Sequence, residues 1–227
     1  MSDHILYEVD GGVATLTINR PEKKNALTIE MSQQFLEIVE GAGEDDGVRV
    51  LIVTGTRGAF CAGVDLQDLA TAQSEGRGPD LRDSSGSRGQ FGALVACPKP
   101  IIGAIDGPAV GMGAEYTCQC DIRIVGPRAR FAWNFAHRGL LADLGAGTWL
   151  LPRQIGPARA LRLLYEGSFL SAEEAVEIGY ADRLVASEDL LDEARKIADS
   201  IMQGSPFSHS RHKALVYEGL GSDLGSH

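Results

Sequence analysis

Long hydrophobic runs are missing from this 227-residue sequence. Its most strongly apolar stretches, such as residues 50–53, are far shorter than the roughly 20 residues that a bilayer-spanning helix needs. The first residues, Met1 to His4, also lack the basic start and apolar stretch of a secretion signal. We therefore expect no membrane association, no signal peptide and a cytoplasmic location.

An excess of positive charge is missing too. The chain has 21 Lys and Arg against 31 Asp and Glu, which gives a net charge of −10 at pH 7. Proteins that bind duplex nucleic acid need clustered basic side chains to neutralise the phosphates. The composition therefore argues against nucleic acid as a partner. A hydrophobic fraction of 44% likewise argues against a disordered chain.

Cysteine is scarce, with four residues in the chain, which is too few for a disulfide scaffold of this size. Cys118 and Cys120 form a C-x-C pair that could supply half of a metal site. No second pair and no histidine stands nearby at ligand spacing. We interpret the cysteines as small buried residues of a reducing cytosol and predict no bound metal.

The common short signatures of catalysis are absent as well. The sequence has no G-x-x-x-x-G-K-[ST] phosphate loop, no G-x-S-x-G elbow and no H-E-x-x-H motif. Gly111 and Gly113 lack the third glycine of a dinucleotide fingerprint, so we do not expect NAD.

What the sequence does contain is an alternation of strands and helices. The β-prone run 13–18 follows Gly11 and Gly12 and predicts a hairpin with residues 5–9. Apolar residues at three- and four-residue intervals predict a helix from Thr28 that ends at Gly41 and Gly43. Buried strands are predicted at 48–54, 100–105 and 121–125, with a helix over 111–120. This order predicts an α/β fold.

The second half of the sequence is predicted to be mainly helical. Helices are indicated from Pro157, from a capping box at Ser171 and Glu174, and over residues 187–202. We therefore divide the chain into a core domain, 1–135, and a helical region, 136–227. Residues 71–90 are rich in Ser, Gly, Arg and Asp, and they are predicted to form a surface loop in preference to a lid.

Two glycine turns, at residues 60–66 and 106–115, each lead from a buried strand toward a predicted helix. Their small side chains leave backbone N–H groups uncovered, and the start of a helix leaves its first N–H groups without internal partners. Two such turns facing each other can bind one carbonyl oxygen as it becomes an oxyanion, at about 3 kcal/mol for each donor. The alternative is that both turns only pack a strand against a helix, and the residues alone do not decide between the two.

Four segments, taken in order along the chain, resemble the crotonase superfamily, that is, the enoyl-CoA hydratase/isomerase family. They are residues 19–27, 60–66, 98–121 and 139–153, and the likeness continues through 170–175. One of these segments alone would carry little weight, but all of them in order identify the family.

The resemblance implies a crotonase-type spiral of repeated β-β-α turns followed by a helical C-terminal region. It also implies a homotrimer or a dimer of trimers. The substrate would be an acyl-CoA or enoyl-CoA thioester, so that coenzyme A is part of the substrate and no separate cofactor is needed. Relatives continue past Gly219 and Leu220 into final helices that help to close the pocket and the trimer.

The resemblance also assigns roles to particular positions. The backbone N–H groups of Val64 and Met112 match the two oxyanion donors, and Lys24 and Ala26 match positions that line the coenzyme A nucleotide. Arg20, Lys23 and Lys24 could supply positive charge for this anionic group in an acidic protein. The other implied substrate-binding positions are Ala62, Gly63, Asp65, Leu66, Gly111, Phe135 and Leu140.

The catalytic carboxylates are where this sequence departs from the family pattern. Glu115 matches the first of the two glutamates that hold water in a hydratase, and the helix N-terminus favours its ionised form. Phe135 stands at the position of the second glutamate, and Asp143 matches the acid/base carboxylate of some isomerases. Asp143 could instead be the N-cap of a helix beginning near Leu144.

From these residues we predict an enzyme that shifts a double bond in an enoyl-CoA through an enolate. The first alternative is an enoyl-CoA hydratase, with water held between the two carboxylates Glu115 and Asp143. The second alternative is an acyl-CoA binding protein without catalytic activity.

Overall fold

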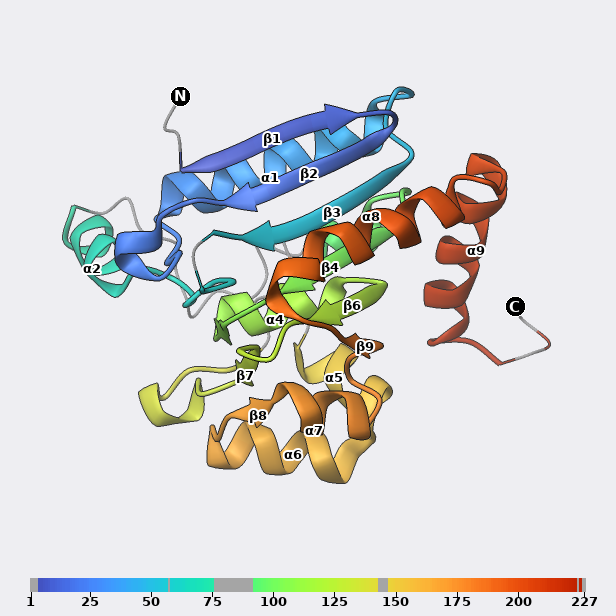
Figure 1. The fold of residues 1–227 in the computed structure, drawn as a ribbon. Coiled ribbons are helices and arrows are strands. Elements are labelled where there is room, and N and C mark those ends of the chain that lie inside the picture. The colour runs from blue at the N-terminus through green and yellow to red at the C-terminus, as the bar shows by residue number, and fades with distance from the viewer. Residues whose placement is uncertain (1–3, 57, 76–91, 143–146, 224, 226–227) are drawn as a thin grey trace.

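The computed structural model describes residues 4–56, 58–75, 92–142, 147–223 and 225. A six-stranded sheet with the strand order β1-β2-β3-β4-β6-β9 runs through the molecule (Figure 1). β1 and β2 form the predicted antiparallel hairpin, and the other neighbouring strands of this sheet are parallel. The strands are β1 (Ile5–Asp10), β2 (Val13–Ile18), β3 (Val50–Gly55), β4 (Ile101–Ile105), β6 (Ile122–Val125) and β9 (Arg183–Leu184).

The central strands of this sheet are buried on both faces. In β3, Leu51 and Val53 belong to the larger hydrophobic core, together with helix α1 (Ile29–Glu44). Val50 and Ile52 point to the opposite face, where they pack in a second cluster with Ala194 of helix α8 (Leu190–Ile201). The continuous apolar run predicted to be a doubly covered strand is therefore confirmed.

Helix α1 begins as predicted, because the Oγ1 of Thr28 accepts a hydrogen bond of 3.1 Å from the N–H of Met31. The prediction that Gly41 and Gly43 end the helix is wrong, since the helix continues through both to Glu44. An ideal Cβ at position 43 would lie 3.1 Å from Cδ of Pro98. Close packing of the helix against the segment that contains Pro98 thus explains why a glycine stands inside the helix. The packing offsets the low helix propensity of glycine.

A smaller sheet, with the order β5-β7-β8, lies beside the first one. Its strands are β5 (Pro108–Val110), β7 (Arg130–Ala132) and β8 (Leu170–Ser171), and helix α4 (Met112–Gln119) follows β5 almost directly. Helices α5 (Gly147–Ile155), α6 (Pro157–Glu166) and α7 (Ala172–Glu177) gather on the side of β7 and β8 (Figure 1).

The capping box at the start of α7 is confirmed. Its Ser171 Oγ accepts from the N–H of Glu174 at 3.2 Å, and the Glu174 carboxylate accepts from the N–H of Ser171 at 3.0 Å.

Two boundaries differ from the prediction. Helix α2 (Leu66–Ser74) includes the first residues of the predicted loop 71–90, while 76–91 lie outside the described residues. The predicted helix over 187–202 consists of a 3-10 turn, η3 (Ser187–Asp189), and then α8. The remaining elements are η1 (Pro21–Lys23), α3 (Ala93–Ala96), η2 (Ala136–Arg138) and α9 (Pro206–Gly219).

The larger hydrophobic core takes residues from both sides of the predicted boundary at 135/136, such as Phe131 and Leu151. The division into two regions stays a prediction. In the described part of the chain, no helix is both long enough and apolar enough to cross a bilayer.

Candidate active site

The first glycine turn is held between two other segments by backbone hydrogen bonds. The N–H of Cys61 donates to the carbonyl of Pro108 at 3.1 Å, and the carbonyl of Cys61 accepts from the N–H of Val110 at 2.9 Å. Two residues later, the carbonyl of Gly63 accepts from the N–H of Leu27 at 2.8 Å. The turn is thus joined to β5 on one side and to the segment after η1 on the other.

The N–H of Val64 points away from the Leu27 side of this turn. The carbonyl of Gly63 and the N–H of Asp65 both bond to Leu27, the latter at 2.8 Å, and successive N–H groups of an extended chain alternate in direction. No acceptor within the described residues receives the N–H of Val64. Val64 as a whole residue is half-buried.

The second glycine turn brings the start of α4 against the first one. Gly111 has φ 55°, a conformation that glycine adopts easily, and Met112 then begins the helix. The N–H of Met112 likewise has no acceptor in the described part of the chain. An ideal Cβ at Gly63 would lie 2.8 Å from the carbonyl oxygen of Val110 and 3.6 Å from the backbone nitrogen of Met112. The two turns are therefore in direct contact.

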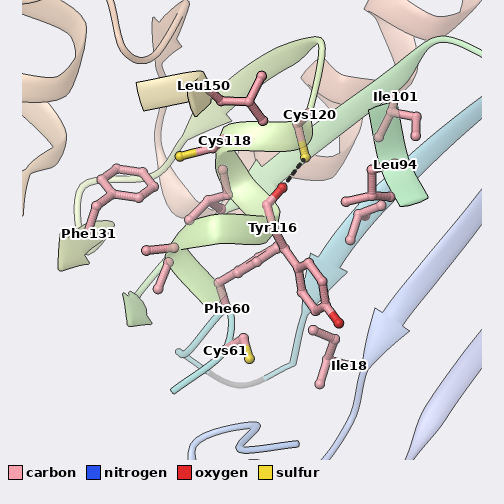
Figure 2. Close-up of a cluster of buried hydrophobic side chains, with 14 of the residues drawn as sticks. Ile18, Phe60, Cys61, Leu94, Ile101, Tyr116, Cys118, Cys120, Phe131 and Leu150 are labelled. Atoms are coloured by element: carbon pink, nitrogen blue, oxygen red, sulfur yellow. Dashed lines mark hydrogen bonds between the residues drawn. The ribbon is translucent and has the colours of Figure 1, made fainter. Parts of the chain in front are cut away.

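Helix α4 is fixed by the apolar core around it. Tyr116 and Cys118 of the helix, and Cys120 directly after it, lie among apolar side chains that include Phe60, Leu94, Phe131 and Leu150 (Figure 2). Burial raises the pKa of the thiols of Cys61, Cys118 and Cys120 to about 12, so these cysteines are protonated and inert at neutral pH. All four cysteines are buried, as predicted.

The C-terminal end of α4 is held by Arg123, which the sequence analysis missed. Its Nη1 donates to the carbonyls of Thr117 at 3.1 Å and Cys120 at 2.6 Å, and its guanidinium lies 5.0 Å from the centre of the Tyr180 ring. A cation at this end offsets the negative pole of the helix. The available signal was a single arginine inside an otherwise apolar strand, since a buried charge requires partners.

Glu115 is fully buried and lies in the first turn of α4, three residues after Met112 and therefore on the same face. A methyl group added to Gly147 would clash with the Glu115 carboxylate, so the first residue of α5 lies directly against it. The structure thus brings Glu115 close to both the Met112 turn and the start of α5.

Phe135 is placed beside the same turn. Its ring carbon Cζ lies 3.8 Å from the ideal Cβ position of Gly111, and only 8% of the residue is exposed. The carbonyl of Phe135 accepts from the N–H of Leu140 at 3.1 Å, and the half-buried Leu140 packs against the core. Asp143 lies outside the described residues. One hydrogen bond joins the described residues before and after it: the carbonyl of Ala142 accepts from the N–H of Thr148 at 2.9 Å.

The segment from Arg20 to Ala26 packs along the first glycine turn. Lys24 is exposed, and its carbonyl accepts from the N–H of Ala62 at 3.0 Å. Ala26 is half-buried, whereas Leu66, the first residue of α2, is 53% exposed.

The charge of Arg20 has a partner inside the protein. Its Nη1 lies 2.8 Å from Oδ2 of Asp65 and 3.0 Å from the carbonyl oxygen of Ala26. The hydrogen bond from Arg20 is the main cause that lowers the pKa of the Asp65 carboxyl. The positive charge available on this segment therefore comes from Lys23 and Lys24, which are exposed.

The described residues contain no group of three or more His, Cys, Asp or Glu side chains that could hold a metal ion.

Comparisons with known proteins identify the family of the chain. The sequence pattern of the enoyl-CoA hydratase/isomerase family matches residues 8–223. The 1,2-epoxyphenylacetyl-CoA isomerase of Escherichia coli K12 is 42% identical over 200 residues, which cover 87% of this chain and 76% of that protein. The crotonyl-CoA hydratase of Syntrophomonas wolfei is 33% identical over 228 residues, covering 98% of this chain and 84% of that protein.

Solved structures give the same result. The enoyl-CoA hydratase of Mycobacterium tuberculosis H37Rv superposes with a TM-score of 0.82 at 35% identity, over 95% of this chain and 90% of that one. An enoyl-CoA hydratase/isomerase of Cupriavidus metallidurans CH34 reaches a TM-score of 0.88 at 33% identity, over 99% of this chain and 83% of that one. The fold is that of a crotonase-type enzyme. The chain belongs to the enoyl-CoA hydratase/isomerase family of the crotonase superfamily.

Proposed function

We propose that this protein moves the double bond of an enoyl-CoA thioester from one position to the next. The proposal rests on the contact between the two glycine turns, which leaves the N–H groups of Val64 and Met112 without protein acceptors within the described residues. The thioester oxygen accepts hydrogen bonds from both N–H groups. As a proton leaves the neighbouring carbon, the negative charge that develops on this oxygen is stabilised by the two donors.

The carboxylates carry the proton. One carboxylate takes it from a carbon of the acyl chain to form the enolate, and the proton returns to a different carbon, so that no atom is gained or lost. Glu115 lies one helical turn beyond the Met112 donor, and Asp143 is the proposed acid/base partner. Coenzyme A extends toward the exposed Lys24 and the half-buried Ala26, where Lys23 and Lys24 attract its phosphates.

Phe135 favours isomerisation over hydration. Its ring lies beside Gly111, at the edge of the proposed oxyanion site, and a phenyl group can neither hold a water molecule nor transfer a proton. Hydration of a 2-enoyl-CoA is the alternative, in which Glu115 and Asp143 hold the attacking water between them. The names of the relatives include both reaction classes, since one is a 1,2-epoxyphenylacetyl-CoA isomerase, named for an epoxide substrate, and another is a crotonyl-CoA hydratase.

We further propose that the protein works in the cytoplasm, and that it forms a homotrimer or a dimer of trimers, as the family resemblance implies.

The function is tested by incubating the purified protein with a 2-enoyl-CoA and a 3-enoyl-CoA separately and identifying the products by mass and chromatography. We expect interconversion of the two substrates without a change of mass. A gain of one water from the 2-enoyl substrate would assign hydratase activity instead. Binding of both thioesters without any product would identify an acyl-CoA binding protein.

Replacing Phe135 by Glu tests why the isomerase reaction is favoured. We expect the ratio of hydrated to isomerised product to rise by about tenfold, because the second carboxylate is restored next to the thioester. The charge replaces a nearly buried ring, so we also expect a loss of several kcal/mol of stability, measured by urea unfolding. Phe135→Gln is the matched control, since it has the same length without a titratable proton. Equal product ratios in the folded Glu and Gln variants would contradict the role given to this position.

A further inference from the structure

Arg20 joins two segments to which the proposed function gives different tasks. Its Nη1 donates to the carbonyl of Ala26, on the segment proposed to contact the nucleotide, at 3.0 Å. The same nitrogen donates to Oδ2 of Asp65, the residue directly after Val64, at 2.8 Å. These two acceptors are far apart in the sequence, and one guanidinium holds both.

The contact is sheltered from solvent. The side chain of Arg20 is 15% exposed and that of Asp65 is 11% exposed. Charge-assisted hydrogen bonds in such surroundings are shorter and stronger than those between neutral groups. The second carboxylate oxygen of Asp65 accepts from the N–H of Gln67 at 3.0 Å and so also fixes the beginning of α2.

The segment that contains Ala26 has a conformation that needs support. Lys24 and Asn25 have φ values of 52° and 58°, in the left-handed region that side chains adopt at some cost. Asn25 is fully buried, and its Nδ2 donates to the carbonyl of Ala59 at 2.7 Å, while its Oδ1 accepts from the N–H of Arg20 at 2.8 Å. The hydrogen bonds of Asn25 therefore help Arg20 to hold the segment 20–26 in a fixed position against the first glycine turn.

We propose that Arg20 is a positioning residue that couples binding of the coenzyme A nucleotide to the orientation of the Val64 N–H. This inference rests on the proposed function. A nucleotide bound over Lys24 and Ala26 restrains the Ala26 carbonyl, and Arg20 transmits that restraint to Asp65, whose backbone sets the direction of its neighbour Val64. Binding energy at a distant part of the substrate is then used to align the transition state.

The coupling is tested with two substrates that carry the same enoyl group, one as the coenzyme A thioester and one as the N-acetylcysteamine thioester, which lacks the nucleotide. We expect Arg20→Gln to lower kcat for the coenzyme A thioester by at least tenfold more than kcat for the truncated one. Arg20→Lys, which keeps the charge near Asp65, should restore part of this difference. The matched control is Arg195→Gln, which removes exposed ion pairs with Asp10 and Asp199 and should leave the ratio of the two kcat values unchanged.

Two outcomes would overturn the coupling. Equal losses of kcat for both thioesters would make Arg20 a structural residue only. A higher KM for the coenzyme A thioester at unchanged kcat would mean that Arg20 acts through its charge on the nucleotide.

A second measurement separates the coupling from the proposed function. In hydrogen exchange of the wild type, adenosine 3′,5′-bisphosphate, which carries the nucleotide but lacks the pantetheine arm, should protect the amides of residues 20–27 and also those of 60–66. In Arg20→Gln the first protection should remain and the second should be lost. If the wild type leaves every enoyl-CoA unchanged, the proposed function fails, whereas the exchange pattern still decides the coupling. The coupling would be ruled out if the protection of residues 60–66 were equal in both proteins, or absent from the wild type.

Discussion

Replacing Met112 by proline is expected to lower kcat by about 10²–10³ while the protein stays folded. Proline has no N–H, so the change removes one of the two proposed oxyanion donors, and the loss of such a donor has this magnitude. The N–H of Met112 has no acceptor among the described residues, so its removal breaks no hydrogen bond of the fold that these residues form.

The helix should tolerate this proline. Met112 is the first residue of α4, and proline is favoured at the first helical position because the N–H there has no partner inside the helix. Thermal unfolding followed by circular dichroism checks that the variant is folded, and kcat is measured with the enoyl-CoA that the wild type converts.

Alanine and glycine at the same position are the controls. Met112→Ala and Met112→Gly keep the backbone donor, and both should retain activity within about tenfold of the wild type. A folded proline variant that binds the thioester and turns it over at the wild-type rate would show that Met112 is not a donor.

Much of this fold could be predicted because its signals are local. Alternating and continuous apolar runs indicated the hairpin and the central strands, and the spacing of Ser171 and Glu174 indicated the start of α7. The two glycine turns could be found for the same reason, since each lies within a few residues of the strand before it. Their contact, however, depends on how β5 pairs with the first turn, and no local pattern contains that pairing.

The glycines themselves show where local reasoning ends. Gly113 has an ordinary helical position, yet a Cβ there would collide with the carbonyl oxygen of Cys61. Gly41 and Gly43 suggested the end of a helix, although the structure continues α1 through both. For Gly113 and Gly43 the reason for the residue is a neighbour from another part of the chain, whereas an ideal Cβ at Gly41 would have nothing within 4 Å.

Contacts of charged side chains with residues distant in sequence were harder still to predict. Arg20 and Asp65 are 45 residues apart, and Arg123 and Tyr180 are separated by 57 residues. The sequence suggested that Arg20 supplies charge to a ligand, because nothing local indicated that Asp65 would neutralise it. Only the packing of the segment before α1 along the first glycine turn brings the two together.

The largest effect is expected from Asp143→Asn, which should reduce the rate of isomerisation by about 10²–10⁴ with nearly unchanged affinity for the thioester. The substitution preserves size and the ability to cap a helix, so a purely structural Asp143 would give only a small change in rate. Single-turnover rates and thioester binding, measured on the same preparation, separate the chemical step from affinity.

Glu115→Gln is the comparison that assigns the two carboxylates. Glu115 is fully buried against Gly147 and shares a helix face with Met112, which suits a group that orients the substrate or holds a proton next to the enolate. If it only orients the substrate, its loss of rate should be clearly smaller than that of Asp143→Asn. Equal losses would indicate a water held between two carboxylates, as in a hydratase. A third outcome is full isomerase activity in Asp143→Asn and none in Glu115→Gln. This outcome would assign the proton transfer to Glu115, because the buried carboxylate would then be the group that both removes and returns the proton.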